Sequence, residues 1–325
     1  MGKSNLDLVR ECDNFPYYED DRALYAENLG NYHAFRVSGC DETLGYILNS
    51  VVEKFPWSPE HWKVDSTAQT VTLVTAPDAT PELRSKLVAQ SIAEAVKLGH
   101  FQVLKGWRNE NYPVFGTGGE YLLEMERCAS PLFGIVGYGA HMNCYVEDVS
   151  GIKIWVPRRA KSKQTYPGML DNTVAGGMAT GEAPGECIIR EAMEEASLPE
   201  SVVRPFIVAR GCVTYSHVRD VRAGGETGLM QPEVEYVYDL KLDANVIPRP
   251  GDNEVEEFKL LSIAQVKEAL ADGEFKPNCA VVMIDFFIRH GILTAENEPD
   301  YLDVVARIHR RLEYPIASHC AKQSI

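Results

Sequence analysis

The segment 176–198 decides the fold, and it reads GGMATGEAPGECIIREAMEEASL. Pro184 suits the first turn of a helix, so the segment predicts a glycine-rich loop that leads into a helix from Pro184 onward. On that helix, Glu194 and Glu195 stand three and four positions after Glu191, which puts three carboxylates on one face. Like charges on one helix face repel by roughly a few tenths of a kcal/mol per pair. A hard divalent cation would remove this repulsion, so the pattern indicates a site for Mg²⁺.

The spacing of this segment resembles the Nudix box, G-x5-E-x7-R-E-U-x-E-E-x-G-U, in which U is a bulky aliphatic residue. Gly176, Glu182 and Arg190 occupy the fixed positions that surround the loop and open the acidic set. Two positions depart from the pattern, because Ala192 replaces a bulky aliphatic residue and Ser197 replaces the late glycine. Neither is a ligand position. Serine adopts the left-handed helix cap less readily than glycine, which leaves the geometry of the helix end open.

The resemblance implies a Mg²⁺-dependent diphosphatase, with Mn²⁺ as an alternative cation. Glu191, Glu194 and Glu195 would hold the cation, which bridges the diphosphate of a small-molecule substrate. Glu182 would support the loop or the metal shell. A metal-activated water would then attack phosphorus. Arg190 lies one turn before Glu194 and is able to pin a carboxylate or a neighbouring loop with two hydrogen bonds.

Two further groups of residues are candidates for binding the substrate's phosphates. Gly176 and Gly177 fit a loop in which the backbone approaches phosphate closely. The basic run 157–163, PRRAKSK, offers Arg158 and Lys163 as phosphate ligands in an otherwise acidic chain. The alternative interpretation of this run is a solubilising surface loop.

Acidic and amide side chains elsewhere are less specific candidates. Glu254, at the entrance to a predicted strand, is the candidate general base or additional metal ligand, with Glu257 as second choice. An acidic strand edge that discourages stray pairing is the alternative. Asp171 and Asn172 either position a ligand or make a turn.

The layout of the whole chain narrows the resemblance to the Nudix proteins related to thiamin pyrophosphokinase. Four segments carry it: GWRNENYPV at 106–114, YPGMLDNTVAGG at 166–177, EVEEF at 254–258 and IDFFIRHG at 284–291. It implies hydrolysis of thiamin diphosphate, or of its damaged oxothiamin and oxythiamin forms, to the monophosphate and phosphate. Such a role belongs to metabolite repair.

Trp107 and Arg108 are the N-terminal residues that we expect to meet the substrate. A tryptophan face stacks on a heterocycle, and an arginine reaches a phosphate. The alternative for Trp107 is core packing, since tryptophan is highly buried on average.

The length of the chain and a change in its pattern of predicted helices and strands near residue 130 predict two domains. The first is an α+β N-terminal accessory domain over 1–130. The second is a Nudix domain over 131–325, an α/β/α sandwich with a mixed sheet. The elements predicted within them include helices over 46–55, 81–98 and 263–271, and a strand pair over 135–146 and 152–157. The last helix of the Nudix domain is predicted over 301–312.

Composition limits the classes of partner. The 325 residues carry a net charge of −15, which argues against a nucleic-acid binder. The N-terminus lacks the apolar core of a secretory signal, and no apolar run is long enough to span a membrane. Eight scattered cysteines, none in a C-x-x-C pair, predict reduced thiols in a cytoplasmic protein. The oligomeric state is left open, with a homodimer as one option.

Three other functions fit parts of the pattern. The residues of the Nudix box recognise only the diphosphate and not the groups attached to it. ADP-ribose or a dinucleotide is therefore the alternative substrate. Isomerisation of an isoprenoid diphosphate is disfavoured, because no histidines with metal-ligand spacing lie near Cys144 or Cys187. A regulatory module with a degenerate site is disfavoured because every box glutamate and the box arginine are present.

Overall fold

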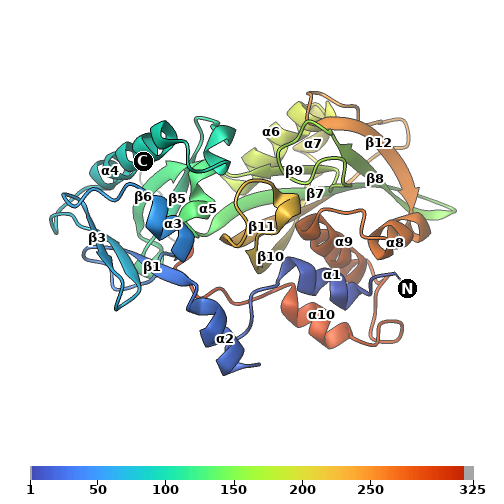
Figure 1. Ribbon diagram of the computed structural model, residues 1–325. Helices are drawn as coiled ribbons and strands as arrows, with labels where there is room; N and C mark the ends of the chain where they lie inside the picture. Colours follow the sequence, from blue (N-terminus) through green and yellow to red (C-terminus); the bar gives the residue numbers. More distant parts are fainter. Residues whose placement is uncertain (1, 318–325) are drawn as a thin grey trace. The chain divides into compact units, whose positions relative to one another are not determined.

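The computed structural model describes residues 2–317, which fold into two compact units (Figure 1). The first unit contains Met1–Asn14, Tyr138–Tyr215 and Glu233–Arg311, and the second contains Phe15–Gly137, Ser216–Pro232 and Leu312–Ile325. Within the described residues, no helix is both long and apolar enough to cross a lipid bilayer. The mixed α/β fold class is confirmed, whereas the domain boundary near residue 130 stays a prediction.

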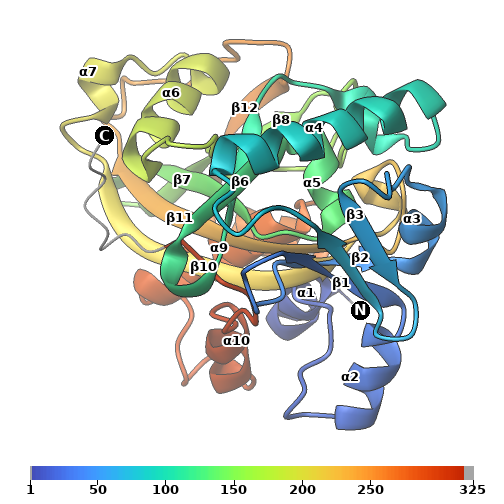
Figure 2. The same cartoon turned by 90° about the vertical axis from the view of Figure 1, so that its left-hand side faces the viewer.

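The second unit is built on a four-stranded sheet in the order β2-β1-β4-β3, accompanied by a separate β5-β6 hairpin. Strand β1 pairs parallel with β4 and antiparallel with β2, so this sheet is mixed. Helix α4 packs against β6, as Figure 2 shows. The elements are α2 (Arg22–Leu29), β1 (Tyr32–Val37), β2 (Gly45–Leu48), α3 (Asn49–Lys54), β3 (Trp62–Asp65), β4 (Thr70–Leu73), α4 (Pro81–Leu98), β5 (Asn111–Phe115), β6 (Tyr121–Glu126) and α5 (Ser130–Phe133).

The predicted helix over 81–98 is confirmed as α4, down to its caps. Thr80 accepts a hydrogen bond from the backbone N–H of Leu83, Pro81 occupies the first turn, and Gly99 ends the helix in the left-handed conformation at φ +68°. These caps satisfy backbone groups that a helix leaves without partners at its ends.

The predicted helix over 46–55 is wrong in its first half. Residues 45–48 form strand β2, and only Asn49–Lys54 are helical. Tyr46 lies opposite Ala34 in the antiparallel ladder with β1, and burial alternates along the strand. A short apolar run fits both a helix and a strand by periodicity alone, so the pairing with β1 decides the outcome.

The first unit contains a six-stranded sheet in the order β10-β11-β7-β8-β12, with β9 paired to β7. The predicted strand pair is confirmed as the β7-β8 hairpin, which turns between Asp148 and Gly151. Helix α6 lies on one side of this sheet and α9 on the other (Figures 1 and 2). The elements are α1 (Asn5–Cys12), β7 (Gly137–Asp148), β8 (Gly151–Arg159), β9 (Val174–Gly177), α6 (Pro184–Ala196), α7 (Glu200–Val203), β10 (Val208–Val218), β11 (Met230–Lys241), β12 (Val255–Ser262), α8 (Ile263–Ala271), α9 (Pro277–Arg289) and α10 (Tyr301–Arg307).

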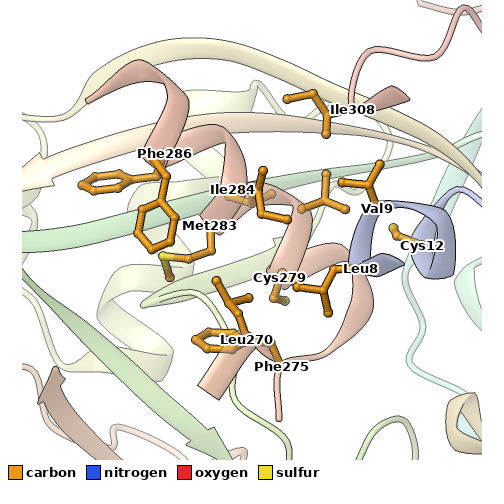
Figure 3. Close-up of a cluster of buried hydrophobic side chains, with 14 of the residues drawn as sticks. Leu8, Val9, Cys12, Leu270, Phe275, Cys279, Met283, Ile284, Phe286 and Ile308 are labelled. Carbon is orange, nitrogen blue, oxygen red and sulfur yellow. The ribbon is translucent and has the colours of Figure 1, made fainter. Parts of the chain in front are cut away.

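The core of the first unit lies between the sheet and α9, as Figure 3 shows. Met283, Ile284 and Phe286 from α9 are fully buried there. Leu8 and Val9 belong to the same cluster, so helix α1 at the start of the chain completes this core. The helix predicted over 263–271 is confirmed as α8, whereas the helix predicted over 301–312 is shorter and ends at Arg307.

Candidate active site

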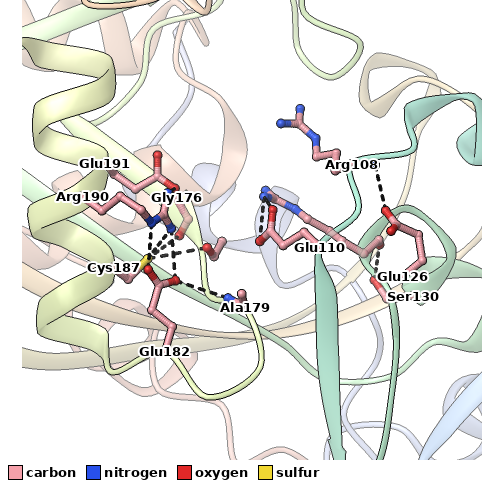
Figure 4. Close-up of polar contacts among 12 residues, drawn as sticks. Arg108, Glu110, Glu126, Ser130, Gly176, Ala179, Glu182, Cys187, Arg190 and Glu191 are labelled. Atoms are coloured by element: carbon pink, nitrogen blue, oxygen red, sulfur yellow. Dashed lines mark hydrogen bonds and ion pairs between the residues drawn. The ribbon is translucent and has the colours of Figure 1, made fainter. Parts of the chain in front are cut away.

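Helix α6 presents the acidic set, and Arg190 at its centre organises it (Figure 4). The Arg190 guanidinium donates to both carboxylate oxygens of Glu182, at 2.8 Å from Nε and 3.1 Å from Nη2. Its Nη1 also donates to Glu191 at 2.9 Å and to Glu194 at 3.1 Å. Arg190 therefore joins the loop glutamate to two of the helix glutamates, which is the clamp role expected from its position.

The two-pronged contact with Glu182 fixes the charge state of that residue. Burial alone would raise the pKa of Glu182, but the hydrogen bonds and positive charge of Arg190 lower it below the ordinary value. The Glu182 side chain is 17% exposed, and it also accepts a hydrogen bond at 3.4 Å from the backbone N–H of Ala179. Glu182 thus ties the loop to α6 and remains ionised.

Glu195 has the opposite electrostatic character. Burial raises the pKa of its carboxyl to about 8, and the nearby charges of Glu191 and Asp171 add to this effect. Its Oε2 accepts a hydrogen bond at 3.1 Å from the backbone N–H of Ala175 in β9, which orients the side chain. Burial and the two neighbouring carboxylates thus outweigh the positive charge near Glu195.

Gly176 is required because Glu191 lies directly against it. A Cβ atom added at Gly176 would lie 2.1 Å from Oε1 of Glu191, so any larger residue would displace the Glu191 side chain. Gly177 pairs with Gly139 in the β7-β9 ladder, and its carbonyl oxygen lies 3.6 Å from the Sγ of Cys187. Gly176 therefore lets strand β9 pass close to α6.

This donor set fits a hard divalent cation. The Glu191 side chain is 12% exposed and the Glu194 side chain is 54% exposed. One carboxylate of the cluster is therefore nearly buried, and another is accessible to water. The raised pKa of Glu195 indicates excess negative potential at the same place. Carboxylate oxygens with access to water are the ligands that Mg²⁺ and Mn²⁺ take in proteins.

Lys163 and Glu254, which are far apart in the sequence, form an ion pair. The Lys163 side chain is only 14% exposed, and burial lowers the pKa of its ammonium group although Glu254 opposes this shift. The charge of Lys163 also acts on Glu195, since it counters the rise of the Glu195 pKa. The structure thus brings a predicted phosphate ligand and the predicted base together near the acidic set.

Arg158, the other predicted phosphate ligand of the basic run, contacts residues outside the acidic set of α6. Its guanidinium donates to the carbonyl oxygen of Gly168 at 2.8 Å and to Glu274 at 2.9 Å. None of its described contacts is with a carboxylate of α6. Its assignment as a phosphate ligand stays a prediction.

The sequence interpretation missed the role of Arg159. This side chain is 9% exposed and donates through Nη1 to Asp171, while Nε and Nη2 hold the carbonyl oxygens of Tyr166 and Thr165 at 3.2 and 3.0 Å. The Arg159 charge lowers the pKa of Asp171 although burial opposes it. Arg159 and Asp171 therefore fix the loop that carries Lys163, and the only sequence signal was the basic run itself.

Trp107 and Arg108 belong to the second unit. Trp107 is 45% exposed, so it is not a core residue, and its Nε1 donates to Asn109 at 2.9 Å. The backbone N–H of Arg108 donates to Glu126 at 3.0 Å. The tryptophan ring is accessible for stacking, and its assignment as a substrate contact stays a prediction.

A glycine loop, an arginine-clamped acidic helix and a sheet between two helix layers are the features of a Nudix-type domain. Comparison with known proteins agrees. A family model described as "NUDIX domain" matches residues 138–279, and one described as "Domain of unknown function (DUF4743)" matches residues 5–137.

Relatives extend across both regions. Nudix hydrolase 24 (chloroplastic) of Arabidopsis thaliana is 33% identical over 284 residues, which is 87% of this chain and 74% of the relative. An uncharacterized protein of Saccharomyces cerevisiae is 45% identical over 238 residues, 71% of this chain and 69% of the relative. A crystal structure of a Deinococcus radiodurans protein matches 45% of this chain and 81% of its own at 23% identity and TM-score 0.34. The chain belongs to the Nudix hydrolase family, so it is an enzyme that cleaves pyrophosphate bonds.

Proposed function

We propose that the enzyme is a divalent-cation-dependent diphosphatase that converts thiamin diphosphate, or its damaged oxothiamin and oxythiamin forms, to the monophosphate and phosphate. One observation carries the chemistry: Arg190 clamps Glu182 of the glycine loop to Glu191 and Glu194 of α6. This arrangement preorganises carboxylate oxygens that would otherwise repel one another.

Each residue has a defined part in this proposal. When bound, Mg²⁺ neutralises charge on the diphosphate and provides an activated water. Glu191, Glu194 and Glu195 hold the cation. Arg190 keeps the carboxylates in place, and the Ala175 N–H does the same for Glu195.

Proton transfer falls to the Lys163–Glu254 pair in our proposal. Lys163 keeps Glu254 negatively charged until a substrate phosphate attracts the ammonium group. Glu254 is then free to accept a proton from the attacking water. The low exposure of Lys163 supports this step, because a partly desolvated ammonium group attracts phosphate more strongly than an exposed one.

The choice of thiamin substrates rests on the four segments that resemble the thiamin pyrophosphokinase-related proteins. These segments lie in both units, at 106–114, 166–177, 254–258 and 284–291. The exposed Trp107 in the first of them supports recognition of a heterocycle by stacking.

The test is a substrate panel with Mg²⁺ in which products are identified by mass spectrometry. Thiamin, oxothiamin and oxythiamin diphosphates should yield the monophosphate with a kcat/KM at least about tenfold above that for ADP-ribose. Hydrolysis of ADP-ribose to AMP with no turnover of any thiamin compound would contradict the substrate proposal and leave the diphosphatase chemistry standing.

A further inference from the structure

The core of the first unit contains a cluster of ligand-type side chains that the diphosphatase chemistry does not use. His141 of β7, Asp171 of the loop before β9, and Cys279 of α9 are all buried. One ligand atom from each lies within 4.8 Å of the other two. A nitrogen, an oxygen and a sulfur donor from three separate elements thus converge at one point.

A fourth group is aimed at the cluster. Glu235 of β11 is 4% exposed, and its Oε2 accepts no hydrogen bond among the described residues. This oxygen lies 3.4 Å from Nε2 of His141. His141 and Glu235 form an ion pair at this distance, so a buried carboxylate lies directly beside the cluster.

The outer atoms of these side chains are already held by protein partners. Asn172 Oδ1 lies 2.8 Å from Nδ1 of His141, and the Asn172 amide donates to the Cys279 carbonyl at 3.2 Å, which fixes its orientation. Nδ1 therefore carries a proton, and Nε2 is the nitrogen that a metal ion would bind in place of a proton. Oε1 of Glu235 accepts from Tyr215 at 2.8 Å and from Asn278 at 3.1 Å.

Asp171 is held in the same manner by Arg159 at one oxygen, while its other oxygen lies 2.7 Å from the Sγ of Cys279. Metal sites in proteins have this construction: an outer partner fixes each ligand and leaves one donor atom directed inward. A thiolate, an imidazole and carboxylates together suit Zn²⁺, and they do not suit Mg²⁺, which takes oxygen alone.

We propose that His141, Asp171 and Cys279 bind a Zn²⁺ ion inside the first unit, with the Glu235 carboxylate beside His141. The ion would bind between β7, α9 and the loop that Arg159 fixes. Because that loop carries Lys163, the ion would stabilise the substrate side of the enzyme without touching the diphosphate. Binding would deprotonate the Cys279 thiol, whose proton is released to solvent.

Cobalt substitution tests the proposal, because a Co²⁺–thiolate bond absorbs in the near ultraviolet. The full-length protein is prepared without zinc and refolded with Co²⁺. We expect the charge-transfer band in the wild type and in Glu194→Gln, which alters only the α6 site. Cys279→Ser should lose the band, whereas Cys144→Ser, a second buried thiol on β7, should keep it.

Two results would overturn the proposal: no band in the folded wild type, or a band that survives in Cys279→Ser. If Cys279→Ser fails to fold, X-ray absorption on the zinc-loaded wild type decides. One sulfur neighbour at about 2.3 Å with nitrogen and oxygen at about 2.0–2.1 Å is expected. A shell without sulfur, or no bound zinc, would contradict the assignment.

Discussion

Arg190 contacts three carboxylates at once, and its guanidinium geometry makes this feasible. The Nε and Nη2 atoms donate to Glu182 in parallel, while Nη1 reaches α6 itself. A lysine offers a single point charge and cannot reproduce this pattern. The side chains that hold metal ligands in place affect metal affinity nearly as strongly as the ligands do.

We therefore expect Arg190→Lys to weaken Mg²⁺ activation by about 10- to 100-fold. Arg204→Lys is the matched control, because Arg204 also pairs with two glutamates, Glu186 and Glu200, but on exposed surface. Mg²⁺ titration of the hydrolysis rate measures both. Equal Mg²⁺ dependence in the two variants would show that the clamp has no such role.

The raised pKa of the Glu195 carboxyl should make the free energy of unfolding of the metal-free enzyme depend on pH. This pKa is raised to about 8 from 4.5, so the folded state binds a proton that the unfolded state has lost. The resulting stabilisation is complete below about pH 4.5 and is lost as pH rises through about 8, by at most about 1.4 kcal/mol per pH unit. Urea unfolding without metal should show this decline, and Glu195→Gln should flatten it. An unchanged slope in Glu195→Gln would rule out the assignment.

Mg²⁺ should counter this decline, because binding displaces the proton from Glu195. Its affinity should therefore increase with pH up to about pH 8 and level off above it. Calorimetric titration at several pH values measures this directly.

Among individual residues, sequence spacing predicted the acidic set because a motif of fixed positions encodes one helix face. It could not separate Arg158 from Arg159. Neighbours on a strand point to opposite faces, and only the fold shows that Arg159 faces Asp171 while Arg158 faces Glu274. The pairing of Lys163 with Glu254 is likewise a tertiary contact between distant segments.

At the scale of elements, the C-terminus of α6 depends on a segment far away in the chain. Ser197 takes the left-handed conformation at φ +52°, so serine fills the place of the usual glycine. The N–H groups of Arg249 and Gly251 donate to the carbonyl oxygens of Ala196 and Glu195 at 2.9 and 3.1 Å. A Cβ atom at Gly251 would lie 2.1 Å from the carbonyl oxygen of Glu194.

We predict that Gly251→Ala displaces the helix end that carries Glu194 and Glu195, lowering stability by about 1–3 kcal/mol and reducing activity. Gly185→Ala in the first turn of the same helix is the control. Its added Cβ would meet only the Tyr238 hydroxyl at 3.9 Å, an ordinary contact. Thermal unfolding and hydrolysis rates measure both variants. If Gly251→Ala matched Gly185→Ala in both, the proposed support of the helix end would be incorrect.

Long helices with clear capping residues, such as α4, were predictable because the capping residues and the apolar periodicity both favour the helix that the structure shows. Residues 45–48 were not, since their apolar spacing fits a helix and their pairing with β1 overrides it. The support of α6 by Arg249 and Gly251 left no local signal either, as it joins backbone groups separated by some fifty residues.

For the whole molecule, the structure shows two compact units. The first contains the acidic helix, the Lys163–Glu254 pair and the buried His141 cluster. The second contains the exposed Trp107. Nothing in the sequence pattern signalled that helix α1 would complete the core of the first unit, because that packing joins the start of the chain to α9.

If the second unit contributes to substrate recognition, Trp107→Ala should raise KM for thiamin diphosphates by about tenfold and leave kcat nearly unchanged. Tyr18→Ala, which removes another exposed aromatic side chain of that unit, should change neither constant. Steady-state kinetics on both variants provides the comparison. An unaltered KM in Trp107→Ala would remove Trp107 from the substrate site.

In the proposed mechanism, carboxylates on one face of α6 hold the cation for diphosphate hydrolysis. This role is tested most directly by comparing Glu194→Gln with Glu186→Gln, since Glu186 is an exposed glutamate of the same helix that pairs with Arg204. The measurement is kcat/KM for oxothiamin diphosphate at saturating Mg²⁺, with folding checked by circular dichroism. We predict a loss of about 100-fold or more in Glu194→Gln and near wild-type activity in Glu186→Gln. A folded Glu194→Gln enzyme as active as Glu186→Gln would show that Glu194 does not hold the cation.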